Sequence, residues 1–160
     1  MGVCVRIIHS SLLPSTHGCD SNSILQDLAE GITIICDRYA FSGICFSHAK
    51  GLSYEWCRSA DIGLPAPDLI VLLEISPEKA RERGGYGEER YEKEEMQAKV
   101  LQTYTKLGKE MREDGRQWVT LDAGKDKSDV ESDIWDVVGP LVSNGVQSDE
   151  VPKLWENRLL

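Results

Sequence analysis

The sequence predicts an α/β fold in which helices flank a parallel sheet. Two apolar runs, residues 32–36 and 69–73, contain mostly β-branched or aliphatic side chains and show no alternation of polar and apolar positions. Such runs are typical of strands that are buried on both faces of a parallel sheet. A third short strand is expected at residues 117–121. Helical segments separate the three strands, and this alternation indicates parallel pairing.

Local signals place the shorter helices. The end of one helix is expected at residues 24–30, and further helices at 39–49, at 54–60 and directly after residue 76. Gly31 is a typical C-terminal stop for the first of them. Ser76 and Pro77 predict a helix start, because serine caps free amides and proline suits the first helical position. Pro65 and Pro67 bracket an extended segment.

A long helix and a final helix complete the predicted fold. The long helix carries one apolar stripe at spacings of three and four residues, formed by Met96, Val100, Tyr104, Leu107 and Met111. Ser128 and Glu131 form a capping box that opens the final helix. The inner face of that helix is expected to carry Ile134, Val138 and Leu141.

Composition and charge narrow the function classes. The chain has 160 residues, which suggests one domain, and its net charge of −9 argues against a nucleic-acid partner. No apolar run approaches the ~18 residues that a membrane helix needs, and the N-terminus lacks a signal-peptide pattern. The five cysteines include no Cys-x-x-Cys pair, which predicts reduced thiols. A cytoplasmic location is expected, with the nucleus or mitochondrion as alternatives.

The first candidate site follows the first buried run. Asp37, Arg38 and Tyr39 come directly after residue 36, and ligands of open parallel sheets bind outside the carboxyl ends of the strands. An acid there can hold a hydrated Mg²⁺, and an arginine can bind phosphate through its planar fork. The alternative is a salt bridge with a helix-capping role.

A glycine-rich segment with an arginine near each end is the second candidate. It runs from Arg83 to Arg90 and Tyr91, and it lies between two predicted helices. Lids of this kind close over phosphates and exclude water. The glycine spacing and the place after a helix exclude a dinucleotide-binding fingerprint. A flexible surface turn is the alternative.

The third candidate is a loop directly after the last predicted strand. It consists of Asp122, Ala123 and Gly124. Backbone groups of a loop at that place could read the edge of a nucleobase. A plain turn is the alternative for these three residues.

Taken together, these segments resemble the thymidylate kinase family in its eukaryotic form. The segment from Asp37 to Gly43 resembles the family pattern Asp-Arg-Tyr-x-x-Ser-Gly, and the similarity continues through Phe46, Ala49-Lys50, Trp56-Cys57 and residues 63–68. Residues 83–92 resemble the family's lid, and Asp122-Ala123 falls at its adenine-contacting loop. The resemblance implies a kinase-like domain over residues 24–145. A divergent, loop-like segment 1–23 would precede it, and a C-terminal tail 146–160 would follow.

The resemblance also implies a fold and a reaction. The fold would be a three-layer P-loop NTPase of the nucleoside-monophosphate kinase type. The reaction would transfer the γ-phosphoryl group of ATP to dTMP, giving dTDP, with Mg²⁺, in a homodimer.

Residue roles follow from the same resemblance. Asp37 would place Mg²⁺ through water, and Arg38 would bind the acceptor phosphate. Arg90 would close on the reacting groups as a third catalytic residue. The acceptor pocket would include Tyr39, Ser42, Gly43, Phe46 and Tyr91. ATP would be held by Arg83, Asp122, Ala123 and Gly124.

One family element has no counterpart in this sequence. The phosphate-binding loop Gly-x-x-x-x-Gly-Lys-Ser/Thr does not occur, because Glu110 follows Gly108-Lys109 and Asp126 follows Gly124-Lys125. The fold is therefore expected to be incomplete at its N-terminus, and the chain alone nearly inactive. In the family the first strand lies between the strands at 32–36 and 69–73. Residues 3–8 have β-branched character and could fill that gap, although Arg6 would be awkward to bury there.

Three alternatives stay open. The chain could be a non-catalytic truncated isoform that pairs with a full-length kinase, as a heterodimer. It could be a poorly folded fragment without function. The acceptor could be dUMP instead of dTMP, because the part of the pocket that stacks the base has no counterpart here.

Overall fold

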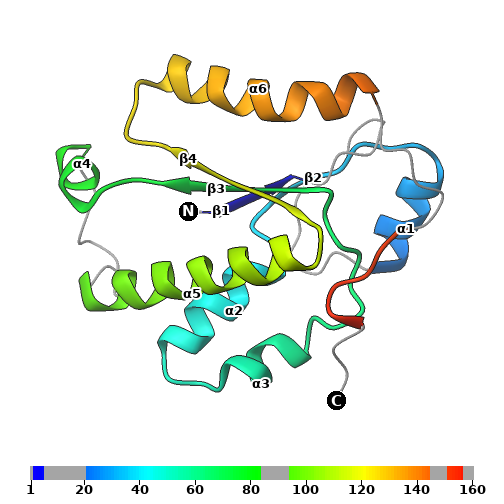
Figure 1. The fold of residues 1–160 in the computed structure, drawn as a ribbon, viewed down its shortest axis with the longest axis horizontal. Helices are drawn as coiled ribbons and strands as arrows, with labels where there is room; N and C mark the ends of the chain where they lie inside the picture. Colours follow the sequence, from blue (N-terminus) through cyan, green and yellow to red (C-terminus); the bar gives the residue numbers. More distant parts are fainter. Residues whose placement is uncertain (1, 6–20, 84–93, 145–150, 157–160) are drawn as a thin grey trace.

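The described part of the chain forms a four-stranded sheet with helices on both faces (Figure 1). The computed structural model describes residues 2–5, 21–83, 94–144 and 151–156. The strands are β1 (Gly2–Val5), β2 (Ile35–Asp37), β3 (Leu69–Glu74) and β4 (Gln117–Asp122). The helices are α1 (Ser21–Ala29), α2 (Ala40–Ala49), α3 (Tyr54–Ser59), α4 (Pro77–Glu82), α5 (Glu94–Glu113) and α6 (Lys127–Asn144).

β1 runs against both of its neighbours in the sheet. The strand order is β2-β1-β3-β4, and β3 pairs with β4 in parallel along its whole length, as predicted. β1 is antiparallel to β2 and to β3, with Cys4 opposite Cys36 on one side and Ile70 on the other. β2, β3 and β4 therefore point the same way, and β1 is a reversed strand inserted among them.

The strand that fills the gap between β2 and β3 overlaps the segment predicted to do so. The predicted strand covers residues 3–8, whereas β1 covers Gly2–Val5. Residues 6–8, including Arg6, lie outside the described residues. Antiparallel ladders are at least as stable per residue as parallel ones. The reversed direction of β1 is therefore compatible with a stable place between β2 and β3.

Cys4 and Cys36 allow a direct test of this register. Facing residues of an antiparallel pair have Cα atoms ~4.5–5.5 Å apart, which is within the range that a disulfide spans. We expect mild oxidation to join Cys4 to Cys36, as detected by mass spectrometry of a non-reduced digest. Cys4→Ser should abolish the product, and Cys57→Ser should leave it unchanged. A product that joins Cys36 to Cys45 instead would contradict the register.

β2 is shorter and more exposed than the sequence predicts. The buried run was expected to begin at residue 32, whereas the strand begins at Ile35, whose side chain is 66% exposed. β2 lies at the edge of the described sheet and pairs there with β1 alone. The expectation of burial on both faces is wrong for this strand, because an edge strand of three residues receives little cover.

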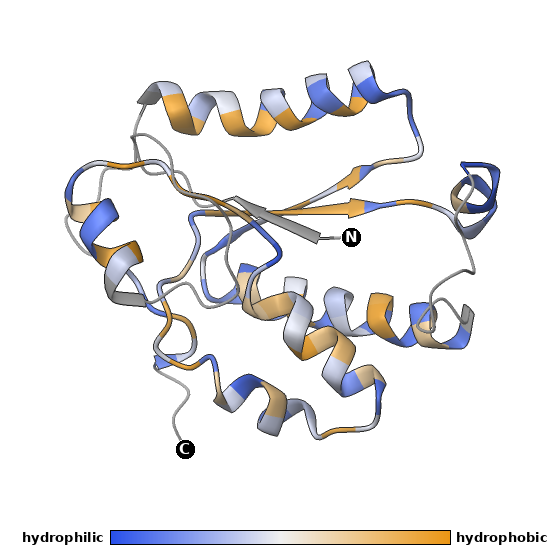
Figure 2. Cartoon of the chain, turned by 180° about the vertical axis from the view of Figure 1, so that it is seen from behind, coloured by the Kyte–Doolittle hydropathy of each residue, from blue (hydrophilic) through white to orange (hydrophobic). Residues whose placement is uncertain are grey.

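β3 separates two apolar clusters. Successive side chains of a strand face opposite sides of the sheet. Ile70 and Leu72 join the cluster with α2 and α5, whereas Leu69 and Val71 join the cluster with α6. Figure 2 shows β3 as hydrophobic for most of its length between these helix layers. The result is the predicted three-layer arrangement.

Most helix predictions are confirmed. Ser76 caps α4 by accepting a hydrogen bond from the Lys79 amide, and Pro77 is the first helical residue. The α5 stripe is buried at Val100, Tyr104, Leu107 and Met111, and it is partly buried at Met96. No helix in the described ranges is long and apolar enough to cross a membrane.

The start of α6 differs from the prediction. The helix begins at Lys127, so Ser128 lies inside the first turn and cannot be the cap of a capping box. The Asp126 carbonyl instead accepts the first hydrogen bonds, from the amides of Asp129 and Val130. The predicted inner face is confirmed, since Val138 is buried against the sheet with Ile134 and Leu141 packed beside it.

Candidate functional site

Three strands end at one edge of the sheet, and the candidate residues lie there. β2, β3 and β4 point the same way, so their carboxyl ends face the side that carries α4 (Figure 1). Asp37 is the last residue of β2, and Asp122 is the last residue of β4. Open α/β sheets bind ligands at this edge.

The turn from β2 into α2 presents an arginine at the surface. Arg38 has a φ of 65°, a left-handed conformation that non-glycine residues rarely adopt. Its guanidinium carbon lies 5.6 Å from the centre of the Phe46 ring, a cation–π contact. Arg38 and Asp37 are both exposed. Backbone strain of this kind costs about 1–3 kcal/mol and is concentrated at functional sites.

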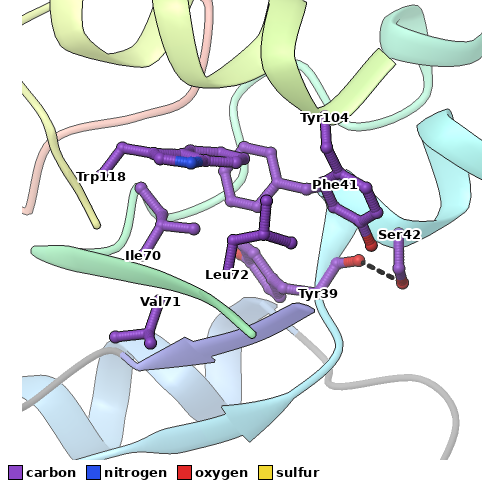
Figure 3. A pocket seen from close by; sticks show the side chains of 8 residues that line it. All are labelled: Tyr39, Phe41, Ser42, Ile70, Val71, Leu72, Tyr104 and Trp118. Atoms are coloured by element: carbon purple, nitrogen blue, oxygen red, sulfur yellow. Dashed lines mark hydrogen bonds between the residues drawn. The ribbon is translucent and has the colours of Figure 1, made fainter. Parts of the chain in front are cut away.

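Tyr39 and Ser42 have structural partners. The Tyr39 hydroxyl donates to the Pro65 carbonyl at 3.0 Å. Ser42 Oγ donates to the Tyr39 carbonyl at 3.0 Å (Figure 3). Ser42 is buried, whereas Gly43 is exposed and an added Cβ there would meet no atom within 4 Å. The structure thus brings Tyr39, Ser42 and Gly43 together at the start of α2, and Gly43 is the exposed one of the three.

The space between α2, α5 and β3 is core and not a ligand pocket. Its lining is largely apolar and includes Phe41, Leu72, Tyr104 and Trp118 (Figure 3). It has no room for a water molecule. Phe41 and Trp118 meet edge to face, with ring centres 5.6 Å apart. A ligand must therefore bind outside this layer, at the strand ends.

The loop after β4 is held by two cations from α4 and its end. Asp122 Oδ1 accepts a hydrogen bond from the Gly124 amide at 2.7 Å. Lys79 Nζ donates to the Gly124 carbonyl at 2.8 Å, and Arg83 Nη2 donates to the Lys125 carbonyl at 2.7 Å. A Cβ on Gly124 would lie 2.7 Å from Lys79 Cδ, so the loop packs closely there. Arg83 is thus hydrogen-bonded to the residue that directly follows the predicted adenine loop.

Sequence reasoning missed Lys79 and the anchoring of this loop to β3. The Ala123 amide donates to the Glu74 carbonyl at 2.7 Å. Ser76 and Pro77 fixed the start of α4, which sets the turn that carries Lys79. The loop that Lys79 meets is 45 residues away in sequence, and no local signal indicates that contact.

The acceptor and adenine candidates are well separated along the edge. Asp37 is level with Val71 of β3. β3 ends three residues later at Glu74, and Glu74 is level with Asp122. At ~3.3 Å per residue and ~4.8 Å per strand, Asp37 lies roughly 10 Å back from Asp122 and roughly 14 Å to its side. The sugar and phosphate groups of a nucleotide fit between two such sites.

Two predicted site residues, Arg90 and Tyr91, lie outside the described residues. Within the part of the chain that the structure describes, no group of three or more histidine, cysteine or acidic side chains could hold a metal ion. Asp37 is not part of such a group among these residues.

The family model of thymidylate kinase matches residues 15–134, which are 120 of the 160 residues. The chain belongs to the thymidylate kinase family. Thymidylate kinase from Schizosaccharomyces pombe is 56% identical over 115 residues, which cover 72% of this chain and 55% of that protein. Thymidylate kinase from Arabidopsis thaliana is 42% identical over 147 residues, which cover 91% and 54%. The chain spans about half the length of these relatives.

A solved thymidylate kinase structure confirms the predicted fold. The Candida albicans enzyme aligns with a TM-score of 0.69 and 29% identity, over 84% of this chain and 66% of that one. The helix layers around the sheet are therefore those of a nucleoside-monophosphate kinase. The reversed β1 lies inside this thymidylate kinase fold.

Proposed function

We propose that this chain forms the acceptor- and adenine-binding part of a thymidylate kinase that converts ATP and dTMP to ADP and dTDP. Family membership supports the type of reaction. The observation that carries the proposal is Arg38, held over Phe46 beside Asp37 at the carboxyl edge of the sheet. The loop at Asp122 supplies a second site along the same edge.

Arg38 would bind the monophosphate of dTMP. Its planar fork of N–H donors matches phosphate oxygens, and the Phe46 ring supports the guanidinium from one side. The sugar and base would then lie over the exposed Gly43 on α2, with Arg90 and Tyr91 of the lid segment closing on them. Tyr39 and Ser42 would act mainly by fixing this turn, since their hydroxyls already have backbone partners.

Asp37 fits a magnesium site of the kind that nucleotides complete. Mg²⁺ in kinase sites is bound through one or two carboxylates together with water and phosphate oxygens. One exposed carboxylate meets that requirement, with the ion held through water. The bound ion would neutralise charge that develops on the transferring phosphoryl group. Asp37 itself would orient this water and the acceptor phosphate at Arg38.

The loop from Asp122 to Gly124 would hold the adenine of ATP. Its backbone is fixed from three directions, by β3 at Ala123 and by Lys79 and Arg83 at its far end. A loop fixed before binding offers its backbone groups to a base edge at little ordering cost. Arg83 would lie close to the bound base.

The 160-residue chain is by itself a poor catalyst in this proposal. Its sequence contains no Gly-x-x-x-x-Gly-Lys-Ser/Thr segment. β1 ends at Val5, which pairs with Ile35 and Leu69 at the edge of the sheet opposite the candidate site. A phosphate loop follows the carboxyl end of a strand at the ligand edge. The carboxyl end of β1 thus lies at the edge of the sheet away from the candidate site.

An exposed aromatic surface favours a second function, pairing with a complete kinase subunit. Trp56 on α3 is 65% exposed and the preceding Leu52 is 44% exposed. Large exposed apolar groups often mark protein contacts. A tagged chain should then retain an untagged complete kinase on an affinity resin, as a heterodimer beside the homodimer. Trp56→Ser should weaken retention, and retention unchanged by Trp56→Ser would count against this surface.

Arg38→Ala tests the main proposal by a binding measurement. Hydrogen bonds to charged groups contribute about 1.5–3 kcal/mol, so the affinity for dTMP should fall roughly 10- to 100-fold. Isothermal titration of dTMP into the chain measures this directly, with MgADP as the second ligand. Arg112→Ala is the matched control, because Arg112 is an exposed arginine in the last turn of α5. Equal dTMP affinity in both variants would remove Arg38 from the acceptor site.

A further inference from the structure

The described C-terminal segment, residues 151–156, packs into the main core. We refer to it as the strap. Leu154 is 2% exposed and Trp155 is 3% exposed. Three backbone hydrogen bonds join the strap to the loop before β3: Gly63 amide to Leu154 carbonyl (2.9 Å), Leu154 amide to Leu64 carbonyl (2.8 Å) and Ala66 amide to Pro152 carbonyl (2.7 Å).

The loop that the strap holds also contacts the candidate acceptor site. The Pro65 carbonyl accepts the hydrogen bond from the Tyr39 hydroxyl, and Pro65 is paired with Lys153 of the strap. Tyr39 directly follows Arg38, the proposed phosphate-binding residue. A displacement of the strap would therefore change the surroundings of the turn that carries Arg38.

Trp155 provides a second connection to the same turn. Its ring centre lies 6.0 Å from that of Phe41, in an edge-to-face contact. Phe41 in turn meets the ring of Tyr39 at 6.3 Å. The guanidinium carbon of Arg58 lies 5.8 Å from the centre of the Trp155 ring. The two connections, through Pro65 and through Phe41, meet at Tyr39.

The two residues at the ends of this series of contacts, Arg38 and Trp155, have a strained backbone. Among the described residues other than glycine, Arg38 and Trp155 are the two with positive φ, at 65° and 54°. Such conformations persist only where the surrounding contacts impose them. Burial of its large ring holds Trp155 in place, and the contacts of Tyr39 with Pro65 and Phe41 hold the turn at Arg38.

We propose that Trp155 is a positioning residue for the acceptor site. Through Pro65 and Phe41 it holds the turn after β2 so that Arg38 is ready to bind the monophosphate. The inference rests on the proposed function of Arg38. It predicts that the strap controls the affinity for dTMP and leaves the adenine loop, which is held separately by α4 and β3, unaffected.

The test compares two ligands in three proteins. Affinities for dTMP and for MgADP are measured by isothermal titration in the wild-type chain, in Trp155→Ala and in Trp155→Phe. We expect Trp155→Ala to bind dTMP about tenfold more weakly, the effect of losing one preorganised hydrogen bond. MgADP affinity should be unchanged, and Trp155→Phe should restore most of the dTMP affinity. Unchanged dTMP affinity, or an equal loss for both ligands, would overturn the proposal.

Tyr39→Phe guards against a variant that fails to fold. It removes one hydroxyl, keeps the ring, and breaks the link to Pro65. Its effect on dTMP affinity should not add to that of Trp155→Ala, because both changes act on one connected set of contacts. Ser59→Ala removes a comparable side chain-to-backbone hydrogen bond at an exposed place and should have no effect. Fully additive effects would contradict a shared route.

Amide hydrogen exchange separates this inference from the proposed function. In Trp155→Ala, exchange should accelerate at Ala66, which bonds to the strap, and also at Ser42, whose amide bonds to the Tyr39 carbonyl. Val130 in α6 should not change. Acceleration confined to residues 63–66 would overturn the coupling. Acceleration that reaches Ser42 in a protein whose wild type does not bind dTMP would support the coupling and overturn the assignment of the acceptor.

Discussion

Purified as the 160-residue chain, the protein should form dTDP from ATP and dTMP at least about 10²- to 10³-fold more slowly than a complete thymidylate kinase assayed beside it. Loss of a single preorganised donor has a cost of that order in other enzymes. A missing phosphate loop removes several amide donors and a lysine at once, and phosphoryl transfer depends almost wholly on such positioning and charge.

The control is Asp37→Ala, expressed in the same host. A trace of host kinase would give equal rates in both preparations, which agrees with an inactive chain. Activity that disappears in Asp37→Ala would mean that the site works and that other residues supply the phosphate contacts. A rate comparable to that of the complete enzyme would contradict the prediction outright.

Phe41→Ala should cost the largest amount of stability among single core changes at this site. Phe41 is 1% exposed and contacts Trp118, Trp155 and Tyr39 edge to face. Truncating a buried phenylalanine lowers the free energy of unfolding by about 3–5 kcal/mol, through lost burial and the cavity left behind. Urea denaturation followed by circular dichroism measures this loss.

Two further variants serve as controls for the loss of stability in Phe41→Ala. Phe41→Leu keeps most of the buried volume and should lose much less. Leu101→Ala changes a side chain that is 40% exposed on α5 and should shift the free energy of unfolding by less than about 1 kcal/mol. Similar losses in Phe41→Ala and Leu101→Ala would mean that the aromatic cluster does not support α2.

Much of the fold could be predicted because its signals are local. The aliphatic run of β3 and the apolar stripe of α5 are both legible from side-chain type and spacing, and both are buried as expected. The placement of Asp37 and Asp122 followed from the same reasoning, since each directly follows or ends a strand.

The unpredicted features depend on contacts between distant segments. The direction of β1 is seen only in its antiparallel pairing with β2 and β3. The exposure of Ile35 depends on β2 being at the sheet edge. The burial of Trp155 depends on a loop about 90 residues earlier in the chain. Neither periodicity nor capping signals report on such pairings.

The position of β1 has a consequence for how the chain assembles during synthesis. Gly2 pairs with Leu72, which the ribosome adds 70 residues later. At translation rates of ~5–20 residues per second, β1 waits several seconds before its second neighbour exists. β1 must therefore be placed between two strands that are made after it, and until β3 is made the edge of β1 that faces β3 has no partner.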